Sequence, residues 1–162
     1  MEAFMSLLGA HAIEVVADVR RHAGSRAHPH FNPEPLALSL AGARIEYCPY
    51  PELGGRKARA DSPNTVWPNA SFRGYADYME TPEFSAGVNR LMQAGPSKGI
   101  ALMCSEAVWW RCQRSLIADA LKVQGVEVLH IMERGKVTEH PYTSAARIVN
   151  GRLSYAEAPT PG

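Results

Sequence analysis

The chain has 162 residues, of which 46% are hydrophobic and 20% are charged. Its 17 Lys and Arg side chains nearly balance its 16 Asp and Glu side chains, which leaves a formal net charge of +1. This composition excludes a disordered or fibrous protein, and the length predicts one domain over residues 1–162. Net charge alone recruits no partner, so an anionic ligand would have to be held by a local cluster of basic side chains.

The cysteines indicate a reducing compartment. There are three of them, Cys48, Cys104 and Cys112, an odd number without paired spacing. The first residues show neither the basic start nor the apolar run of a signal peptide. No apolar stretch reaches the roughly 20 residues that a membrane-spanning helix needs. We therefore expect a cytoplasmic protein with reduced thiols and no membrane partner.

The first third of the chain predicts a helix, a strand, a helix and a strand. Apolar residues with helical spacing precede the apolar run 13–19, which is typical of a buried strand. Asn32-Pro33-Glu34 combines a helix cap, a proline suited to the first turn and an acid that favours the helix dipole. This helix should end at Gly42, and residues 44–47 read as the next strand.

A long aperiodic segment and two helices follow. Residues 53–70 contain glycines and prolines without apolar periodicity, which predicts a long loop or a lid. Ser71 is a candidate cap for a short aromatic helix that continues through Tyr75, Tyr78 and Met79. Thr81-Pro82-Glu83 starts a second helix that should end at Gly95.

The remaining pattern completes an α/β fold. Residues 100–104 and 126–132 read as strands on either side of a helix over 112–124. Asn150-Gly151 suits a type I′ turn and predicts a C-terminal β-hairpin over 146–156. The order of the elements predicts a mostly parallel sheet with helices on both faces and this C-terminal hairpin.

The junction between the third strand and its following helix concentrates the reactive side chains. Arg111 and Arg114 stand at the start of the predicted helix, where the helix dipole disfavours positive charge. A negative partner is therefore expected nearby. It could be an internal acid such as Glu106 or Asp18, or an external phosphate or carboxylate bound by the guanidinium groups. Trp110 beside them could stack on a base or line the cleft.

Two thiols share this junction. Positive surroundings would lower the pKa of Cys104 and Cys112, which makes each a candidate nucleophile with Glu106 as acid or base. The competing interpretation is that both are small buried hydrophobic residues. Seven residues separate them in the chain, whereas structural zinc sites favour thiol pairs two to four residues apart, so no metal is expected.

Several motifs occur in a characteristic order. They are Asp18-Val19-Arg20, Glu52-Leu53-Gly54-Gly55, Phe72-Arg73-Gly74-Tyr75, Cys104-Ser105-Glu106 and Cys112-Gln113-Arg114. This series resembles the bacterial family catalogued as domain of unknown function 488. The resemblance implies little about activity, because the family is uncharacterised. That family usually carries a histidine where this chain has Gln113. A weaker resemblance to rhodanese-like domains fails at residues 105–111, which contain no glycine to form a phosphate-cradling loop.

These observations predict a cleft at the carboxyl ends of the strands that binds a phosphate-bearing ligand, either a nucleotide or a nucleic-acid segment. The alternative is a cysteine-dependent transferase or hydrolase that uses Cys104 or Cys112, with Glu106 moving the proton. No cofactor is expected in either case. The candidate ligand-binding residues are Arg20, Arg26, Glu52, Arg73, Tyr75, Trp110, Arg111 and Arg114.

Overall fold

The computed structural model describes residues 1–24, 26–55, 60–95, 98–104, 109–133 and 136–156. The α-helices are α1 (Glu2–Ala10), α2 (Pro33–Gly42), α3 (Ala70–Tyr78), α4 (Pro82–Ala94) and α5 (Arg114–Val123). The strands are β1 (Val15–Asp18), β2 (Glu46–Pro49), β3 (Ile100–Met103), β4 (Leu129–Glu133), β5 (Lys136–Glu139), β6 (Arg147–Val149) and β7 (Arg152–Ser154). Short 3₁₀ turns are η1 (Pro29–Phe31), η2 (Pro51–Leu53) and η3 (Trp109–Arg111). Of the helices in the described ranges, none is both long and apolar enough to cross a membrane.

The central sheet is parallel, with the strand order β2-β1-β3. Val15 of β1 is in register with Glu46 of β2 on one side and with Ile100 of β3 on the other. The connections after β1 and after β2 therefore run in opposite directions along the sheet. This reversal between β1 and β3 is a topological switch point, where open α/β sheets form a crevice at the carboxyl ends of their strands.

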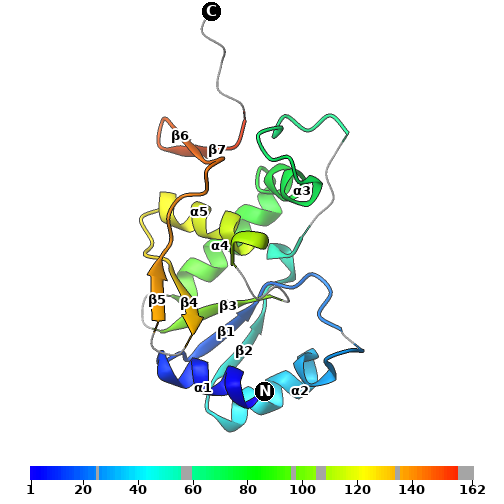
Figure 1. Cartoon of the computed structure of the whole chain (residues 1–162), viewed down its shortest axis with the longest axis vertical. Coiled ribbons are helices and arrows are strands. Elements are labelled where there is room, and N and C mark those ends of the chain that lie inside the picture. Colours follow the sequence, from blue (N-terminus) through cyan, green and yellow to red (C-terminus); the bar gives the residue numbers. More distant parts are fainter. Residues whose placement is uncertain (25, 56–59, 96–97, 105–108, 134–135, 157–162) are drawn as a thin grey trace, which may run out of the picture.

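Helices cover both faces of this sheet, as predicted (Figure 1). Val16 of β1 belongs to a buried cluster with residues of α1 and α2, including Leu8, Leu36 and Leu40. Its neighbour Ala17 belongs to a second cluster, which α3, α4 and α5 supply. Successive strand residues point to opposite faces, so two separate apolar layers follow directly from the continuous apolar run of β1.

Two helix starts differ from the predicted ones. Asn69, not Ser71, caps α3, because its side chain accepts hydrogen bonds from the backbone N–H groups of Ser71 (2.8 Å) and Phe72 (3.3 Å). Thr81 caps α4 as predicted and accepts from the N–H of Phe84. The last major helix begins at Arg114, because η3 precedes it.

The strand predicted over 126–132 does not extend the three-stranded sheet. It forms as β4, which pairs antiparallel with β5 in a separate two-stranded sheet. Only residues 134–135 separate these strands, and a parallel pairing needs a much longer crossover connection. The C-terminal hairpin does form as expected: β6 pairs with β7, and Asn150 (φ 53°) and Gly151 (φ 75°) adopt the left-handed conformations of a type I′ turn.

Candidate functional site

A cleft of about 510 Å³ opens beside the carboxyl ends of the strands. The segment after β1 contributes Arg21 and His22, and the segment between β3 and α5 contributes Arg111 and Gln113. The other lining residues are Gly55, Ser71, Phe72 and Tyr75. Among these described lining residues there are basic side chains and no acidic one. The cleft therefore has the chemistry of an anion site.

Gly54 permits the chain to bring Arg21 to this cleft. A Cβ atom at Gly54 would lie 2.5 Å from both the backbone nitrogen and the Cβ of Arg21. Such contacts with backbone atoms cannot be relieved by a side-chain rotation. Gly54 is thus required for packing against Arg21. Gly55 is not, because a Cβ at Gly55 would meet no atom within 4 Å.

Two of the predicted ligand-binding residues line the cleft. Arg111 is exposed there. Tyr75 is only 1% exposed, and its hydroxyl donates a 2.8 Å hydrogen bond to the carbonyl oxygen of Leu53. Tyr75 therefore forms the buried wall of the cleft and fixes η2. Phe72, next to it in the lining, offers the more accessible ring face.

Arg20 is held by groups of the protein itself. Its Nε and Nη2 donate to the Oδ1 (2.8 Å) and Oδ2 (2.7 Å) of Asp18, and Nη2 also donates to the carbonyl of Phe31 (2.7 Å). The hydrogen bond to Asp18 raises the pKa of Arg20. The hydroxyl of Tyr47 completes the group by donating to Oδ2 of Asp18 at 2.6 Å, and burial raises the pKa of Tyr47 to about 12. Asp18 is thus an internal acid that pairs with an arginine, as predicted. Its partner is Arg20, however, and not Arg111 or Arg114.

Four other predicted ligand-binding residues lie outside the lining of the cleft. Glu52 pairs with Arg90 of α4 at 2.8 Å. Arg73 donates to the carbonyl oxygens of residues 67 and 68. Arg26 is exposed in the loop after β1, and Trp110 is 50% exposed on η3. The structure thus brings Arg111 and Tyr75 to one cleft, whereas Glu52 contacts α4 and Arg73 contacts the segment before its own helix.

The two candidate nucleophiles are in contact. The Sγ atoms of Cys104 and Cys112 are 2.6 Å apart, and both residues are free cysteines. Cys104 is partly exposed, whereas Cys112 is only 3% exposed. The Cys112 thiol also lies 3.2 Å from Oε1 of Gln113 and accepts from the backbone N–H of Arg114 at 3.4 Å.

The surroundings of Cys112 favour its thiolate. The hydrogen bond from Cys104 is the main cause, the backbone and side chain of Arg114 add to it, and burial opposes it. Together they lower the pKa of Cys112 from 9.0 to about 6. Arg114, predicted to bind a ligand, is not among the described lining residues of the cleft, and its backbone N–H contacts this thiol. Glu106, the predicted acid or base, lies outside the described residues.

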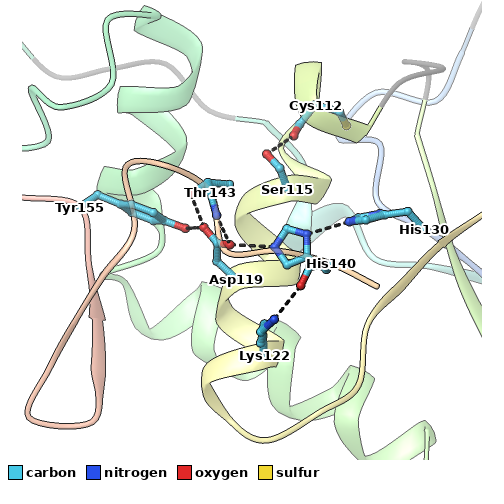
Figure 2. Close-up of polar contacts among 8 residues, drawn as sticks. All are labelled: Cys112, Ser115, Asp119, Lys122, His130, His140, Thr143 and Tyr155. Carbon is cyan, nitrogen blue, oxygen red and sulfur yellow. Dashed lines mark hydrogen bonds and ion pairs between the residues drawn. The ribbon is translucent and has the colours of Figure 1, made fainter. Parts of the chain in front are cut away.

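A buried polar network is centred on Asp119 of α5, and it was not predicted from the sequence (Figure 2). The carboxylate oxygens of Asp119 accept from the Thr143 N–H (3.0 Å), the Thr143 hydroxyl (2.6 Å) and the Tyr155 hydroxyl (2.7 Å). Nε2 of His140 lies 2.8 Å from Oδ1, and Nδ1 of His140 lies 2.7 Å from Nε2 of His130. A carboxylate on the apolar face of a predicted helix was the available signal, because buried acids require partners.

This network reaches η3 through an aromatic stack. Trp109 covers His130, and Trp109 also meets the edge of His140 at 5.3 Å between ring centroids. Burial, and then electrostatic interactions with His140 and Arg114, lower the pKa of His130 from 6.5 to about 4. Within the described ranges, no group of three or more His, Cys, Asp or Glu side chains is arranged to hold a metal ion.

Comparison with known proteins agrees with the motifs. No curated protein and no solved structure matches the chain. One family model matches residues 1–121, a range that ends inside α5 and so precedes His130, His140 and Tyr155. Because this match covers most of the sequence, the chain belongs to the family described as "Domain of unknown function DUF488".

Proposed function

We propose that this protein binds a phosphate-bearing ligand, a nucleotide or a nucleic-acid segment, in the cleft beside the carboxyl ends of β1 and β3. The observation that supports this most directly is that Arg21 and Arg111 line the same cleft, with no acidic side chain among its described lining residues. Arg21 follows β1 and Arg111 ends η3, so the fold brings residues 90 positions apart to one cleft. Guanidinium forks suit the paired oxygens of a phosphate.

The remaining lining residues match the other parts of a nucleotide. Phe72 offers a ring face for a base, and such stacking is worth about 1–3 kcal/mol per base. Gln113 and Ser71 supply neutral donors and acceptors for a sugar or a base edge. A volume of about 510 Å³ is within the usual range for a small-ligand pocket.

Thermal-shift measurements with inorganic phosphate, a set of mononucleotides and short single-stranded oligonucleotides test this proposal. At least one of these probes should raise the melting temperature, and Arg21→Gln together with Arg111→Gln should abolish the shift. Arg44→Gln is the matched control, because Arg44 is exposed at the amino end of β2, away from the cleft. If no probe stabilises the protein, or if the double variant responds like the parent, the proposal is wrong.

A cysteine-dependent transferase or hydrolase is the second candidate. The observation that favours it is the Cys112 thiol, whose pKa of about 6 leaves it largely ionised at neutral pH. Gln113, which follows this thiol, lines the cleft, so a substrate held by Arg111 would lie near it. Labelling with iodoacetamide tests this candidate: Cys104 or Cys112 should react faster than a free model thiol at neutral pH, and a slower reaction of both would exclude a nucleophilic role.

A further inference from the structure

The contact between Cys104 and Cys112 has a use that ligand binding does not require. Their Sγ atoms, at 2.6 Å, need to approach only slightly to reach the roughly 2.05 Å of a disulfide bond. One residue follows β3 and the other precedes α5, so both lie next to regular elements. Seven residues lie between them in the chain.

We propose that Cys104 and Cys112 are a reversible dithiol–disulfide pair that reacts with hydroperoxides. The different exposure of the two thiols assigns them different roles. Cys104 is partly exposed and can meet a small oxidant, whereas Cys112 is 3% exposed and is reached most readily by the sulfur already touching it. The third cysteine, Cys48, lies on β2, where it is in register with Ala17. In this proposal it is neither the thiol that meets the oxidant nor the thiol that forms the disulfide with it.

The reaction balances in two steps. Proton exchange across the sulfur contact places the thiolate on Cys104, which attacks the terminal oxygen of the hydroperoxide. The O–O bond breaks, and the leaving alkoxide or hydroxide takes the proton of Cys112 and departs as an alcohol or water. Cys104 becomes a sulfenic acid, and Cys112 becomes a thiolate. The Cys112 thiolate then attacks the sulfur of Cys104 and expels hydroxide, which takes up a proton to form water. Two thiols are oxidised, and one hydroperoxide is reduced.

The surroundings of Cys112 make the second step fast. The N–H of Arg114 stabilises the Cys112 thiolate, which is the form that attacks a sulfenic acid. Because the resolving thiolate already touches its target, the sulfenic acid should not accumulate. Over-oxidation to sulfinic acid, which is irreversible for most proteins, is thereby avoided.

Thiol counting on the full chain tests this proposal. The reduced protein, treated with hydrogen peroxide, should lose two of its three thiols and recover them with dithiothreitol. Peptide mapping should find a disulfide between Cys104 and Cys112, formed on the order of tenfold faster than Cys48 is oxidised. The Cys48→Ser variant should behave like the parent.

Each single variant gives a distinct result. Cys112→Ser leaves the sulfenic acid of Cys104 without its resolving thiol, so dimedone should trap it. Cys104→Ser should leave the buried Cys112 thiol slow to react. Circular dichroism is used to check that each variant folds, and Cys104→Ser, at the partly exposed position, is the milder change. A disulfide that involves Cys48, or loss of single thiols at equal rates from all three cysteines, would overturn the proposal. These results do not depend on any ligand of the cleft.

Discussion

Trp109 lies flat on His130, with ring centroids 4.1 Å apart and ring planes within 3° of parallel. Trp109 begins η3, and Arg111, which lines the cleft, ends it. The stack therefore ties a cleft-lining arginine to the network of His130, His140 and Asp119 that is buried against α5. A change inside this network should reach the cleft through η3.

Stability should fall below neutral pH because of His130. Its pKa is about 4 in the folded protein against 6.5 for an ordinary histidine, so the unfolded chain binds the proton more tightly between these values. The stability that neutral His130 contributes is complete above pH 6.5 and is lost as the pH falls toward 4. The slope is at most about 1.4 kcal/mol per pH unit, its value where the two states differ by one whole proton. Urea unfolding across this range measures it.

The variant His130→Gln should flatten this dependence, because glutamine does not titrate. His28→Gln is the control, since His28 is exposed in the loop before η1. An unchanged slope in His130→Gln would show that another group is responsible.

Replacing Asp119 should destabilise the protein more than removing any one of its donors. Asp119→Asn turns one acceptor oxygen into an NH₂ group that faces O–H or N–H donors, and we expect a loss of about 3 kcal/mol. Tyr155→Phe removes a single hydroxyl and should cost about 1 kcal/mol. Chemical denaturation of both variants checks this order. Equal losses would mean that Asp119 depends mainly on Tyr155.

Arg20 should behave as a structural residue in the same assays. Lysine cannot reproduce the two-pronged contact with Asp18, so Arg20→Lys should lower the free energy of unfolding by about 2 kcal/mol. Arg111→Lys, at an exposed position, should leave stability within about 0.5 kcal/mol of the parent. If Arg20→Lys is equally neutral, the contacts with Asp18 and Phe31 do not support the fold.

The two adjacent glycines should respond differently to alanine. Gly54→Ala places a methyl group against the backbone of Arg21 and should displace that segment, weakening whatever probe the cleft binds by about tenfold. Gly55→Ala meets no atom within 4 Å and should bind nearly as the parent does. Titration of both variants with the probe found by thermal shift gives the comparison. Similar weakening in both would point to backbone freedom instead of the contact with Arg21.

Local signals in the sequence predicted most of the segments and the place of the cleft. The apolar run before Asp18, the Thr81 cap and the Asn150-Gly151 turn each act over a few residues, and each formed as expected. The choice of partners could not be predicted in this way. Glu52 and Arg20 are both polar residues near strand ends, yet Glu52 pairs with Arg90 across 38 positions, and Arg20 pairs locally with Asp18. Only the three-dimensional packing of α4 against η2 distinguishes them.

The partners of Asp119 could not be predicted from local signals either. Its partners Thr143 and Tyr155 are 24 and 36 positions away in the chain, beyond the reach of any periodic pattern. Arg21 and His22 directly follow the predicted ligand-binding residue Arg20 in the sequence, but their place in the cleft depends on the close approach of Gly54.

The donors of Asp119 also set an order of events during synthesis. Helix α5 leaves the ribosome before Thr143 and Tyr155 do, so the carboxylate of Asp119 initially lacks these hydrogen bonds. An acid without donors resists burial, which keeps the apolar face of α5 from settling fully on the sheet. The packing of α5, which begins at Arg114, is therefore complete only once the donors of Thr143 and Tyr155 are in place.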